Sequence, residues 1–271
     1  MSLLKPDHVF IDLSYFIIHK YFGIIAWLKL TKQEPLDQAG MFDRFKIVFE
    51  EALMKMKGRY GFAWSQVILA KDCPRDEIWR NKLFPDYKKA RSLPENRKQN
   101  FDPAIFKYVV DNVIPELQLK YGGLTVLAVN GAEADDIVAI AHRLLGGPDK
   151  KILIITNDND YIQLLNDNTT IINASCLELK SRFDETQLSV FVEWKIIKGD
   201  VSDSIPSIAK KVGDKTALKF ALDKELLEKK MASDPLIRDR YEMNKTMISF
   251  ESIPSDIFSL IEQKMKEVKI I

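Results

Sequence analysis

Short apolar runs alternate with longer amphipathic stretches along most of the chain. Four runs have the length and the flanking turn residues of buried strands: 9–13, 66–72, 124–129 and 151–156. Because consecutive positions in these runs are apolar, both faces of each strand should be buried. Four further stretches have the spacing of amphipathic helices: about 15–29, 41–58, 102–120 and 133–145. The alternation predicts an α/β fold with a mostly parallel central sheet and helices on both of its faces.

The pattern changes near residue 184, where short helices separated by turns replace the alternation of strands and helices. No repeat or low-complexity linker separates the two parts, so we expect one compact unit. It would consist of an α/β core over residues 1–183 and a helical region over residues 184–271 packed on that core. One inserted segment, about residues 75–100, is polar and proline-containing, and we expect it to add little to the hydrophobic core.

Composition gives little information about binding partners, because 40 Lys and Arg residues nearly cancel 39 Asp and Glu residues. Any affinity for nucleic acid must therefore come from local clusters of charge. The two cysteines, Cys73 and Cys176, are too few for a disulfide framework and lack metal-binding spacing, which is typical of a reducing compartment. Charged residues interrupt the most apolar stretch, 16–30, and no signal sequence opens the chain. We expect a soluble intracellular protein without a membrane span.

Acidic residues follow all four predicted strands, and the carboxyl ends of parallel strands meet at one edge of a sheet, where ligands gather. The helical region adds two more in the sequence GDVSDSIP. A single Asp after a strand is more often a helix cap or a turn residue than a functional group. Recurrence at every strand end favours a shared site. The candidates are Asp12, Asp72, Glu133, Asp135, Asp136, Asp158, Asp160, Asp200 and Asp203.

So many carboxylates at one sheet edge would repel each other strongly without cations among them. Oxygen ligands without histidine or cysteine favour Mg²⁺, or Mn²⁺ in its place, over zinc. Two such ions about 4 Å apart activate water and stabilise the leaving oxygen in phosphodiester hydrolysis. Spacing leaves open whether Asp135 or Asp136 faces the metals, because the answer depends on whether Glu133 lies inside the helix.

A basic segment follows Asp72 and would lie beside the acidic site. Between residues 75 and 98 it contains eight basic residues and four acidic ones. A charged run of this kind is most often a solvent-exposed face, but Lys or Arg beside an aromatic side chain also suits a phosphate and an unstacked base. The candidate residues are Arg80, Tyr87, Lys88, Lys89 and Arg91.

A second basic segment lies in the helical region, in KGDVSDSIPSIAKKVGDKTALKF. A helix, a tight turn at Gly213 and a new helix starting near Asp214 would direct backbone N–H groups at a phosphate of duplex DNA. The alternative for Gly213 is a plain helix C-cap. The candidate DNA-binding residues are Lys210, Lys211, Gly213, Lys215 and Thr216.

Taken in order, five motifs resemble the 5′ nucleases, which include flap endonucleases, the 5′-nuclease domain of DNA polymerase I and phage 5′-3′ exonucleases. The phage ribonuclease H type is the nearest in appearance. The motifs are FIDLSYF, KD followed by IWRNKLFPDYKKAR, EADDIVA, TNDNDYIQLL, and GDVSDSIP followed by VGDKTAL. The resemblance runs from about residue 9 to residue 221. It implies a PIN-like core, a helical arch and a helix-hairpin-helix-like element.

The resemblance also implies roles for the candidate residues. The first metal ion would be held by Asp12, Asp72, Glu133 and Asp135. The second would be held by Asp158, Asp160 and Asp203, with Asp136 and Asp200 beyond the direct ligands. Arg80, Tyr87, Lys88 and Arg91 would belong to the arch, which steers the scissile phosphate to the metals.

The implied substrate is DNA with a 5′ flap, a nick or a free 5′ end, or an RNA–DNA hybrid, cut by a monomer in replication or repair. The family's hairpin often holds a monovalent cation such as K⁺. In this chain the hairpin sequence SIPSIAKKVGDKTA lacks most of the family's glycines.

Three other interpretations remain open. A PIN-like ribonuclease would share the acidic edge but would need neither the arch nor the hairpin. A haloacid-dehalogenase-type phosphatase also begins with a strand that ends in Asp, but its nucleophile motif is DxD and this chain has Asp12-Leu13-Ser14. A DNA-binding module without catalysis would have no use for so many mutually repelling carboxylates.

Overall fold

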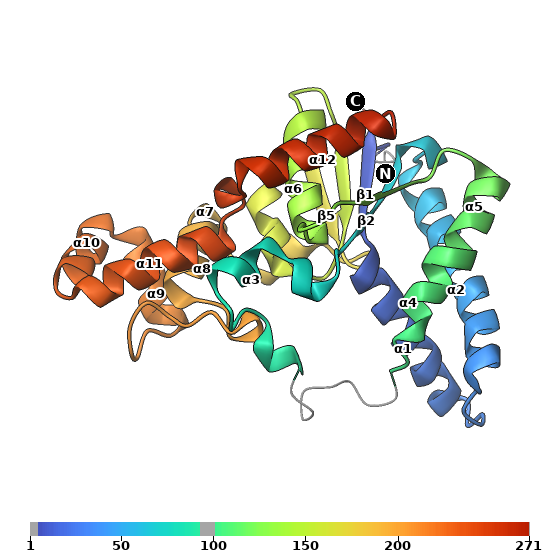
Figure 1. Cartoon of the computed structure of the whole chain (residues 1–271), viewed down its shortest axis with the longest axis horizontal. Helices are drawn as coiled ribbons and strands as arrows, with labels where there is room; N and C mark the ends of the chain where they lie inside the picture. Colours follow the sequence, from blue (N-terminus) through green and yellow to red (C-terminus); the bar gives the residue numbers. More distant parts are fainter. Residues whose placement is uncertain (1–4, 93–100, 271) are drawn as a thin grey trace.

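A five-stranded parallel sheet forms the centre of the molecule (Figure 1). The structure is a computed structural model and describes residues 5–92 and 101–270. The strands lie in the order β3, β2, β1, β4, β5, and every neighbouring pair is parallel. Their bounds are β1 (His8–Asp12), β2 (Val67–Lys71), β3 (Thr125–Ala128), β4 (Ile152–Ile155) and β5 (Thr169–Ile172). The predicted fold class is confirmed, and β5 is a strand that the apolar runs did not predict.

Side chains of the central strands enter two separate cores. Phe10 and Ile154 point into one core, whereas Val9, Ile11 and Leu153 point into the other. Successive residues of a strand face opposite sides of the sheet, so each core receives alternate residues. All five side chains are fully buried. Burial on both faces explains why continuous apolar runs, rather than alternating ones, mark these strands.

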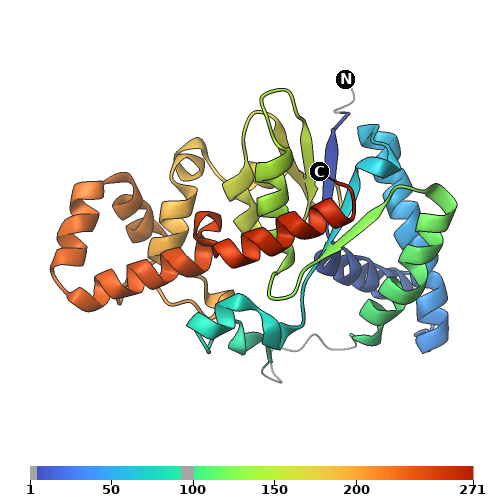
Figure 2. The same ribbon diagram turned by 45° about the horizontal axis from the view of Figure 1, so that its top comes forward.

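Helices cover both faces of the sheet (Figures 1 and 2). Four pack on one face: α1 (Leu13–Leu30), α2 (Gln38–Tyr60), α4 (Ala104–Tyr108) and α5 (Ile114–Tyr121). On the other face lie α6 (Ala134–Leu145) and the last helix, α12 (Ser255–Glu267). In the described part of the chain, no helix is both long enough and apolar enough to cross a membrane.

The helix expected over residues 102–120 is divided. A π-helical turn, Val109–Val113, separates α4 from α5. Pro115 stands at the start of α5 and has no backbone N–H to donate, so the hydrogen-bond pattern of an uninterrupted α-helix cannot form there.

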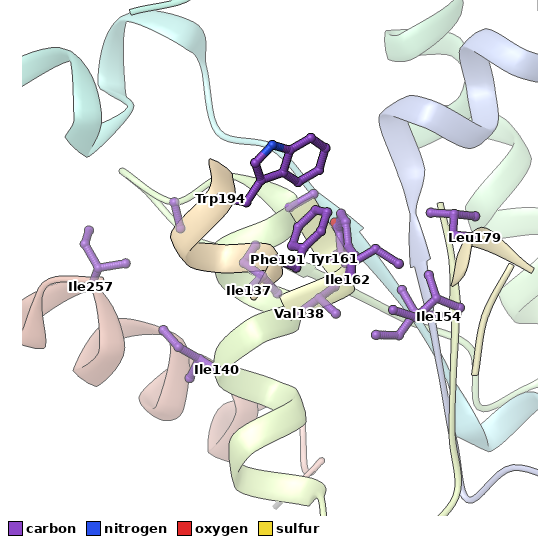
Figure 3. Packing of buried hydrophobic residues seen from close by; sticks show 14 of the residues in the cluster. Ile137, Val138, Ile140, Ile154, Tyr161, Ile162, Leu179, Phe191, Trp194 and Ile257 are labelled. Carbon is purple, nitrogen blue, oxygen red and sulfur yellow. The ribbon is translucent and has the colours of Figure 1, made fainter. Parts of the chain in front are cut away.

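The helical region continues the core beside α6. Its helices are α7 (Glu185–Ser189), α8 (Phe191–Lys198), α9 (Asp214–Leu222), α10 (Lys224–Ala232) and α11 (Pro235–Ile248), followed by α12. Figure 3 shows Phe191 and Trp194 of α8 close to Tyr161 and to Ile137 of α6. These contacts place α8 against the turn after β4 and the start of α6, while α9, α10 and α11 extend away from α1 and α2 (Figure 1). The division at residue 183 stays a prediction.

The inserted segment contributes more to the core than the sequence predicts. Ile78 and Tyr87 are buried in a small cluster with residues of α8 and α11, and Trp79 of α3 (Trp79–Leu83) packs in the core beside α6. The prediction that this segment adds little to the hydrophobic core is therefore wrong for its described residues. Apolar side chains are interspersed among its charged ones, and Ile78, Trp79 and Tyr87 are buried. Residues 93–100, the rest of the expected arch, lie outside the described residues.

Candidate active site

A cavity of about 810 Å³ lies at the carboxyl edge of the sheet. β1 ends at Asp12, Asp72 follows β2, and Glu133 is the N-cap residue of α6. Of the nine candidate carboxylates, six line this cavity: Asp12, Asp72, Glu133, Asp135, Asp158 and Asp200. The sheet edge and the segment after α8 therefore bring together acids from Asp12 to Asp200 in the sequence.

One wall of the cavity is aromatic. Tyr161, Phe191 and Trp194 line it, and Figure 3 shows these three side chains grouped beside α6. Tyr161 is 1% exposed and Trp194 is 7% exposed. The cavity thus combines acidic side chains with flat apolar surfaces.

Hydrogen bonds fix Asp12 and Asp72 from two sides. Asp12 accepts from the backbone N–H of Tyr15 at 2.9 Å and from the hydroxyl of Thr156 at 3.0 Å. Asp72 accepts from the backbone N–H of Ala134 at 2.8 Å and from the hydroxyl of Ser14. Asp12 therefore caps α1 and also lines the cavity, so the helix-cap interpretation is confirmed and a functional role stays a prediction. Both carboxylates are preorganised without any cationic partner.

Asp160 and Asp200 share a lysine. The ammonium nitrogen of Lys195 lies 2.6 Å from an oxygen of each carboxylate. Gly199 makes this approach possible for Asp200, because its φ is +74° and a Cβ there would lie 2.5 Å from the carbonyl oxygen of Ile205. Asp158 accepts a hydrogen bond from the N–H of Asp160 at 2.9 Å, which closes the turn after β4.

Arg80 is buried beneath the cavity. Its guanidinium donates two hydrogen bonds to Asp136, at 2.8 and 3.0 Å, and one to Glu133 at 2.9 Å. Trp79 donates a further hydrogen bond to Asp136 at 2.9 Å. Asp136 has no exposed surface and lies outside the cavity lining, whereas Asp135 is part of that lining. Of the two aspartates, Asp135 therefore faces the cavity and Asp136 faces Arg80, and which of them binds metal stays a prediction.

This placement corrects the role predicted for Arg80. A side chain that is 1% exposed, with its nitrogens bonded to two carboxylates and to the carbonyl of Met247, has no surface to offer a phosphate. Glu133, Asp135 and Asp136 have oxygens within 4.8 Å of one another, which by itself would suit a cation. Since Arg80 already supplies that charge to Asp136, the hydrogen bonds favour a structural role for Asp136.

Lys88 and Arg91 lie at the cavity itself. Lys88 forms an ion pair with Glu133 and lies 3.8 Å from Asp203, and Arg91 forms an ion pair with Asp203. Tyr87 is buried and donates a hydrogen bond to Glu133 at 2.9 Å. The three-residue spacing of Lys88 and Arg91 would place them on one face of a helix, but Lys88 has a φ of +55° and only a short 3₁₀ turn follows it.

Lys89 points elsewhere. Its side chain is 69% exposed and forms an ion pair with Asp86 at 2.9 Å. It is therefore available to solvent but does not line the cavity.

The ion pairs divide the nine carboxylates into two groups. Five have a Lys or Arg partner within 4.0 Å: Glu133, Asp136, Asp160, Asp200 and Asp203. Four have none among the residues that the structure describes, and all four line the cavity: Asp12, Asp72, Asp135 and Asp158. Four uncompensated carboxylates around one cavity favour a bound cation. The all-oxygen donor set fits a hard divalent metal ion.

The pKa values reflect the same uncompensated charge. Burial, with the nearby charges of Asp72 and Asp158, raises the pKa of Asp12 to about 7. Burial also raises the pKa of Asp135 well above its ordinary value, even though Arg80 opposes this shift. Perturbed carboxyl groups in a cleft are typical of functional sites.

The hairpin differs from its prediction in one respect. Residues 206–213 form turns and irregular backbone rather than a helix, and Gly213 is the N-cap residue of α9. Asn244 holds the irregular segment by donating to the carbonyls of Ile196 and Pro206, at 2.9 and 2.7 Å. The second helix begins at Asp214, as predicted, and the C-cap alternative for Gly213 is wrong.

The basic residues of the hairpin are accessible. Lys210, Lys211, Lys215 and Thr216 are exposed. None of the three lysines has a carboxylate partner among the described residues. Asp214, at the start of α9, is paired with Lys198 at 2.6 Å. This surface is therefore net positive.

Two residues of the site have no counterpart in the sequence-based predictions. Lys195 lies inside an apolar helix, and a charged residue amid buried neighbours could have drawn attention to it. Arg182 donates to the backbone carbonyl of Asn157 at 3.3 Å and to the side chain of Asn159 at 2.9 Å, on either side of Asp158. No sequence signal links Arg182 to this turn, since the contact depends on the path of the chain after β5.

Fold and site together define a class: parallel α/β proteins with an acidic, metal-suited cavity and adjacent basic side chains at the carboxyl edge of the sheet. The family model described as the 5′-3′ exonuclease N-terminal resolvase-like domain matches residues 7–193. The chain belongs to the 5′-3′ exonuclease family and is a nuclease. The predicted family is confirmed.

Several curated relatives are similar over most of the chain. The 5′-3′ exonuclease of Buchnera aphidicola subsp. Schizaphis graminum is 32% identical over 225 residues, which cover 81% of this chain and 71% of the relative. The corresponding protein of Buchnera aphidicola subsp. Acyrthosiphon pisum is 28% identical over 232 residues, covering 83% and 73%. DNA polymerase I of Deinococcus radiodurans is 30% identical over 232 residues, which are 83% of this chain but 22% of the polymerase.

Solved structures from bacteriophage T5 share the fold. The flap endonuclease in a complex with DNA and metal ions is 14% identical, with a TM-score of 0.65 and coverage of 97% of this chain and 99% of that one. The 5′-exonuclease with bound zinc is 15% identical, with a TM-score of 0.64 and coverage of 96% and 98%.

Proposed function

We propose that this nuclease hydrolyses phosphodiester bonds of DNA at a 5′ flap, a nick or a free 5′ end, with two Mg²⁺ ions or with Mn²⁺ in their place. The observation that supports this proposal best is the set of four unpaired carboxylates in one cavity, with Lys88 and Arg91 beside them. The complex of the T5 flap endonuclease with DNA and metal ions supports the same substrate and cofactor class for a protein of this fold.

The unpaired carboxylates of the cavity would be the main metal ligands, and Asp160 and Asp203 would exchange their Lys or Arg partners for the second ion. Asp12, Asp72 and Asp135 would hold the first ion, with Glu133 at its edge. Asp158, Asp160 and Asp203 would hold the second, with Asp200 near it. Ions bound there supply an activated water and stabilise the charge on the leaving oxygen.

The chain's own residues would orient the phosphate. Lys88 and Arg91 line the cavity and carry charges that the phosphate can share with Glu133 and Asp203. Arg80 and Tyr87 would act indirectly, because both donate hydrogen bonds to Glu133 and so fix the side chain that positions Lys88. The buried aromatic side chains of Tyr161, Phe191 and Trp194 would exclude water from one side of the cavity and support its wall.

The hairpin before and within α9 would bind the backbone of the adjacent duplex. Lys210, Lys211 and Lys215 are exposed and unpaired among the described residues, and Gly213 and Thr216 lie at the start of α9, where N–H groups are free to contact phosphate. Binding of K⁺ at the hairpin, use of RNA–DNA hybrids, a monomeric state and an intracellular location all stay predictions.

Product mapping tests the proposal. The purified protein would be incubated with 5′-labelled flap, nicked, blunt duplex, RNA–DNA hybrid and single-stranded RNA substrates, with Mg²⁺ and with EDTA. We expect Mg²⁺-dependent cleavage near the junction of the flap and short products from free 5′ ends. Preferential cleavage of single-stranded RNA would contradict the proposal and favour a PIN-like ribonuclease instead.

A further inference from the structure

A second cavity, of about 250 Å³, lies between α1, α2 and the segment that follows β5. Its charged lining consists of Lys20, Lys55 and Arg59 against Glu51. Three positive charges and one negative charge leave a net charge of +2. No carboxylate of the described residues lies within ion-pair distance of any of the three cations. The lining is thus positive and uncompensated.

Lys20 holds its positive charge in a partly buried position of this cavity, where an anion would stabilise it. Its side chain is partly buried, and its ammonium nitrogen lies 5.1 Å from the centre of the Phe16 ring. Burial lowers the pKa of Lys20, and the charge of Lys55 lowers it further, although Cys176 opposes the shift. Two ammonium groups that repel each other in a partly enclosed space favour an anion between them.

A hydrogen bond connects this cavity to the active-site cavity. Tyr15 lines the active-site cavity, and its hydroxyl oxygen accepts from the N–H of Ala174 at 2.9 Å. Ala174 lines the second cavity. Asp12 is the N-cap residue of α1, and Lys20 lies eight residues further along the same helix. At 1.5 Å per residue, this separation corresponds to about 12 Å. One DNA strand advances about 3.4 Å per phosphate along the axis of a duplex, so a few phosphates are enough to span this gap.

We infer that this second cavity binds a backbone phosphate of the nucleic acid strand that continues from the active site across α1. We call it the α1–α2 phosphate pocket, defined by Lys20, Lys55, Arg59 and Ser175. Arg59 can donate two parallel hydrogen bonds to a phosphate, and Lys20 and Lys55 add point charges. The hydroxyl of Ser175, which also lines the pocket, offers a neutral donor. This inference rests on the proposed function, because it assumes that the active site holds DNA.

Salt-dependent binding provides the first test. Flap DNA would be titrated with the wild type, Lys55→Ala and Arg59→Ala in Ca²⁺, which prevents turnover, at several salt concentrations. We expect each pocket variant to bind about 3- to 10-fold more weakly and to reduce the slope of log K against log salt by about 1. Lys57→Ala is the matched control, because Lys57 lies on the same helix but does not line the pocket. A slope change in Lys57→Ala equal to that of the pocket variants would overturn the inference.

Chemical labelling provides the second test. Cys176 lines the pocket and is partly exposed, whereas Cys73 is 9% exposed, so the neutral reagent N-ethylmaleimide should modify Cys176 selectively. Flap DNA in Ca²⁺ should slow this reaction at least several-fold, and Lys55→Ala together with Arg59→Ala should remove the protection. Equal rates with and without DNA would overturn the inference. So would full protection by millimolar inorganic phosphate alone, because the ligand would then be free phosphate.

The two tests do not depend on cleavage. If the wild type fails to cut flap DNA with Mg²⁺, the proposed function is wrong, whatever the binding results. The pocket inference alone is wrong if the wild type cuts flap DNA and the pocket variants match the wild type in both tests. They would then bind flap DNA equally tightly, and the DNA would still protect Cys176 from N-ethylmaleimide.

Discussion

The guanidinium of Arg80 donates two hydrogen bonds to the carboxylate of Asp136, from Nη2 to Oδ1 at 2.8 Å and from Nη1 to Oδ2 at 3.0 Å. The exposed fractions of the two side chains are 1% and 0%. Nη1 also contacts Glu133, and Nε donates to the carbonyl of Met247 in α11. Arg80 therefore connects the inserted segment, α6 and α11 below the active-site cavity.

Arg80→Ala should lower the free energy of unfolding by about 3–5 kcal/mol, because it leaves the buried Asp136 carboxylate without its counter-ion. Urea unfolding at pH 7 measures this change. Arg143→Ala is the matched control: Arg143 pairs with Glu251 on the surface, and both side chains are at least 45% exposed. Its expected loss is about 0–1 kcal/mol. Equal losses in the two variants would show that Arg80 is not a structural anchor.

Lys88→Ala or Arg91→Ala should slow cleavage more than it weakens DNA binding. Both side chains line the cavity, where their contacts to the phosphate would strengthen as the reaction proceeds. We expect a loss of about 10- to 100-fold in the single-turnover rate, which is about 1.4–2.7 kcal/mol of barrier. Affinity for flap DNA in Ca²⁺ should change about 3-fold or less.

Lys89→Ala is the control for this pair, because Lys89 points to solvent and does not line the cavity. It should leave the single-turnover rate unchanged and weaken binding slightly. A loss of binding in Lys88→Ala or Arg91→Ala as large as the loss of rate would mean that these side chains only hold the substrate.

Lys195→Met should increase the rise in melting temperature that divalent ions cause in the protein. Lys195 neutralises Asp160 and Asp200 in the metal-free protein, so its removal leaves two more uncompensated carboxylates at the proposed second metal site. We expect a lower melting temperature without metal and a larger rise on adding Ca²⁺ than in the wild type. Lys198→Met, on the same helix but paired with Asp214, is the control. A smaller rise in Lys195→Met would indicate that the lysine supports metal binding.

Metal binding should release protons near neutral pH. In the metal-free protein, burial raises the pKa of Asp12 to about 7, with help from Asp72 and Asp158, and burial also raises that of Asp160 to about 7. A carboxyl with a raised pKa keeps its proton in the folded protein where the unfolded chain has lost it, so metal-free stability falls as pH rises from 3.8 to about 7. Divalent ions bind the carboxylate form, so their affinity should rise over the same range.

Titration calorimetry with Ca²⁺ at pH 6.5 in two buffers of different ionisation enthalpy measures the protons released. We expect net release in the wild type and less in Asp12→Asn. Identical heats in both buffers would contradict the raised pKa values.

Much of the fold could be predicted from the sequence, because strands buried on both faces leave continuous apolar runs. All four predicted strands are present. The missed strand, β5, has the sequence TTII, which is only four residues long and half threonine. It lies at the edge of the sheet, where one partner suffices and less apolar character is needed.

The site could be predicted in part. Strand ends located the acids, since topology alone brings carboxyl ends of parallel strands together. The role of Arg80 could not be predicted, because its burial depends on Met247, 167 residues later in the chain. The bridge formed by Lys195 likewise depends on how α8 packs against the turn after β4, which no local pattern specifies.

Carboxylates that line this cavity or lie beside it are proposed to hold the divalent ions used for DNA cleavage. The most direct measurement compares Asp135→Asn and Asp160→Asn with Asp149→Asn, an exposed aspartate outside the cluster, in Mg²⁺-dependent cleavage of flap DNA and in binding of the same DNA in Ca²⁺. The first two variants should lose cleavage by about 1000-fold or more, about 4 kcal/mol of barrier, while they still bind DNA and Asp149→Asn behaves as the wild type. Full activity in Asp135→Asn or Asp160→Asn would contradict the proposal that these carboxylates hold the divalent ions.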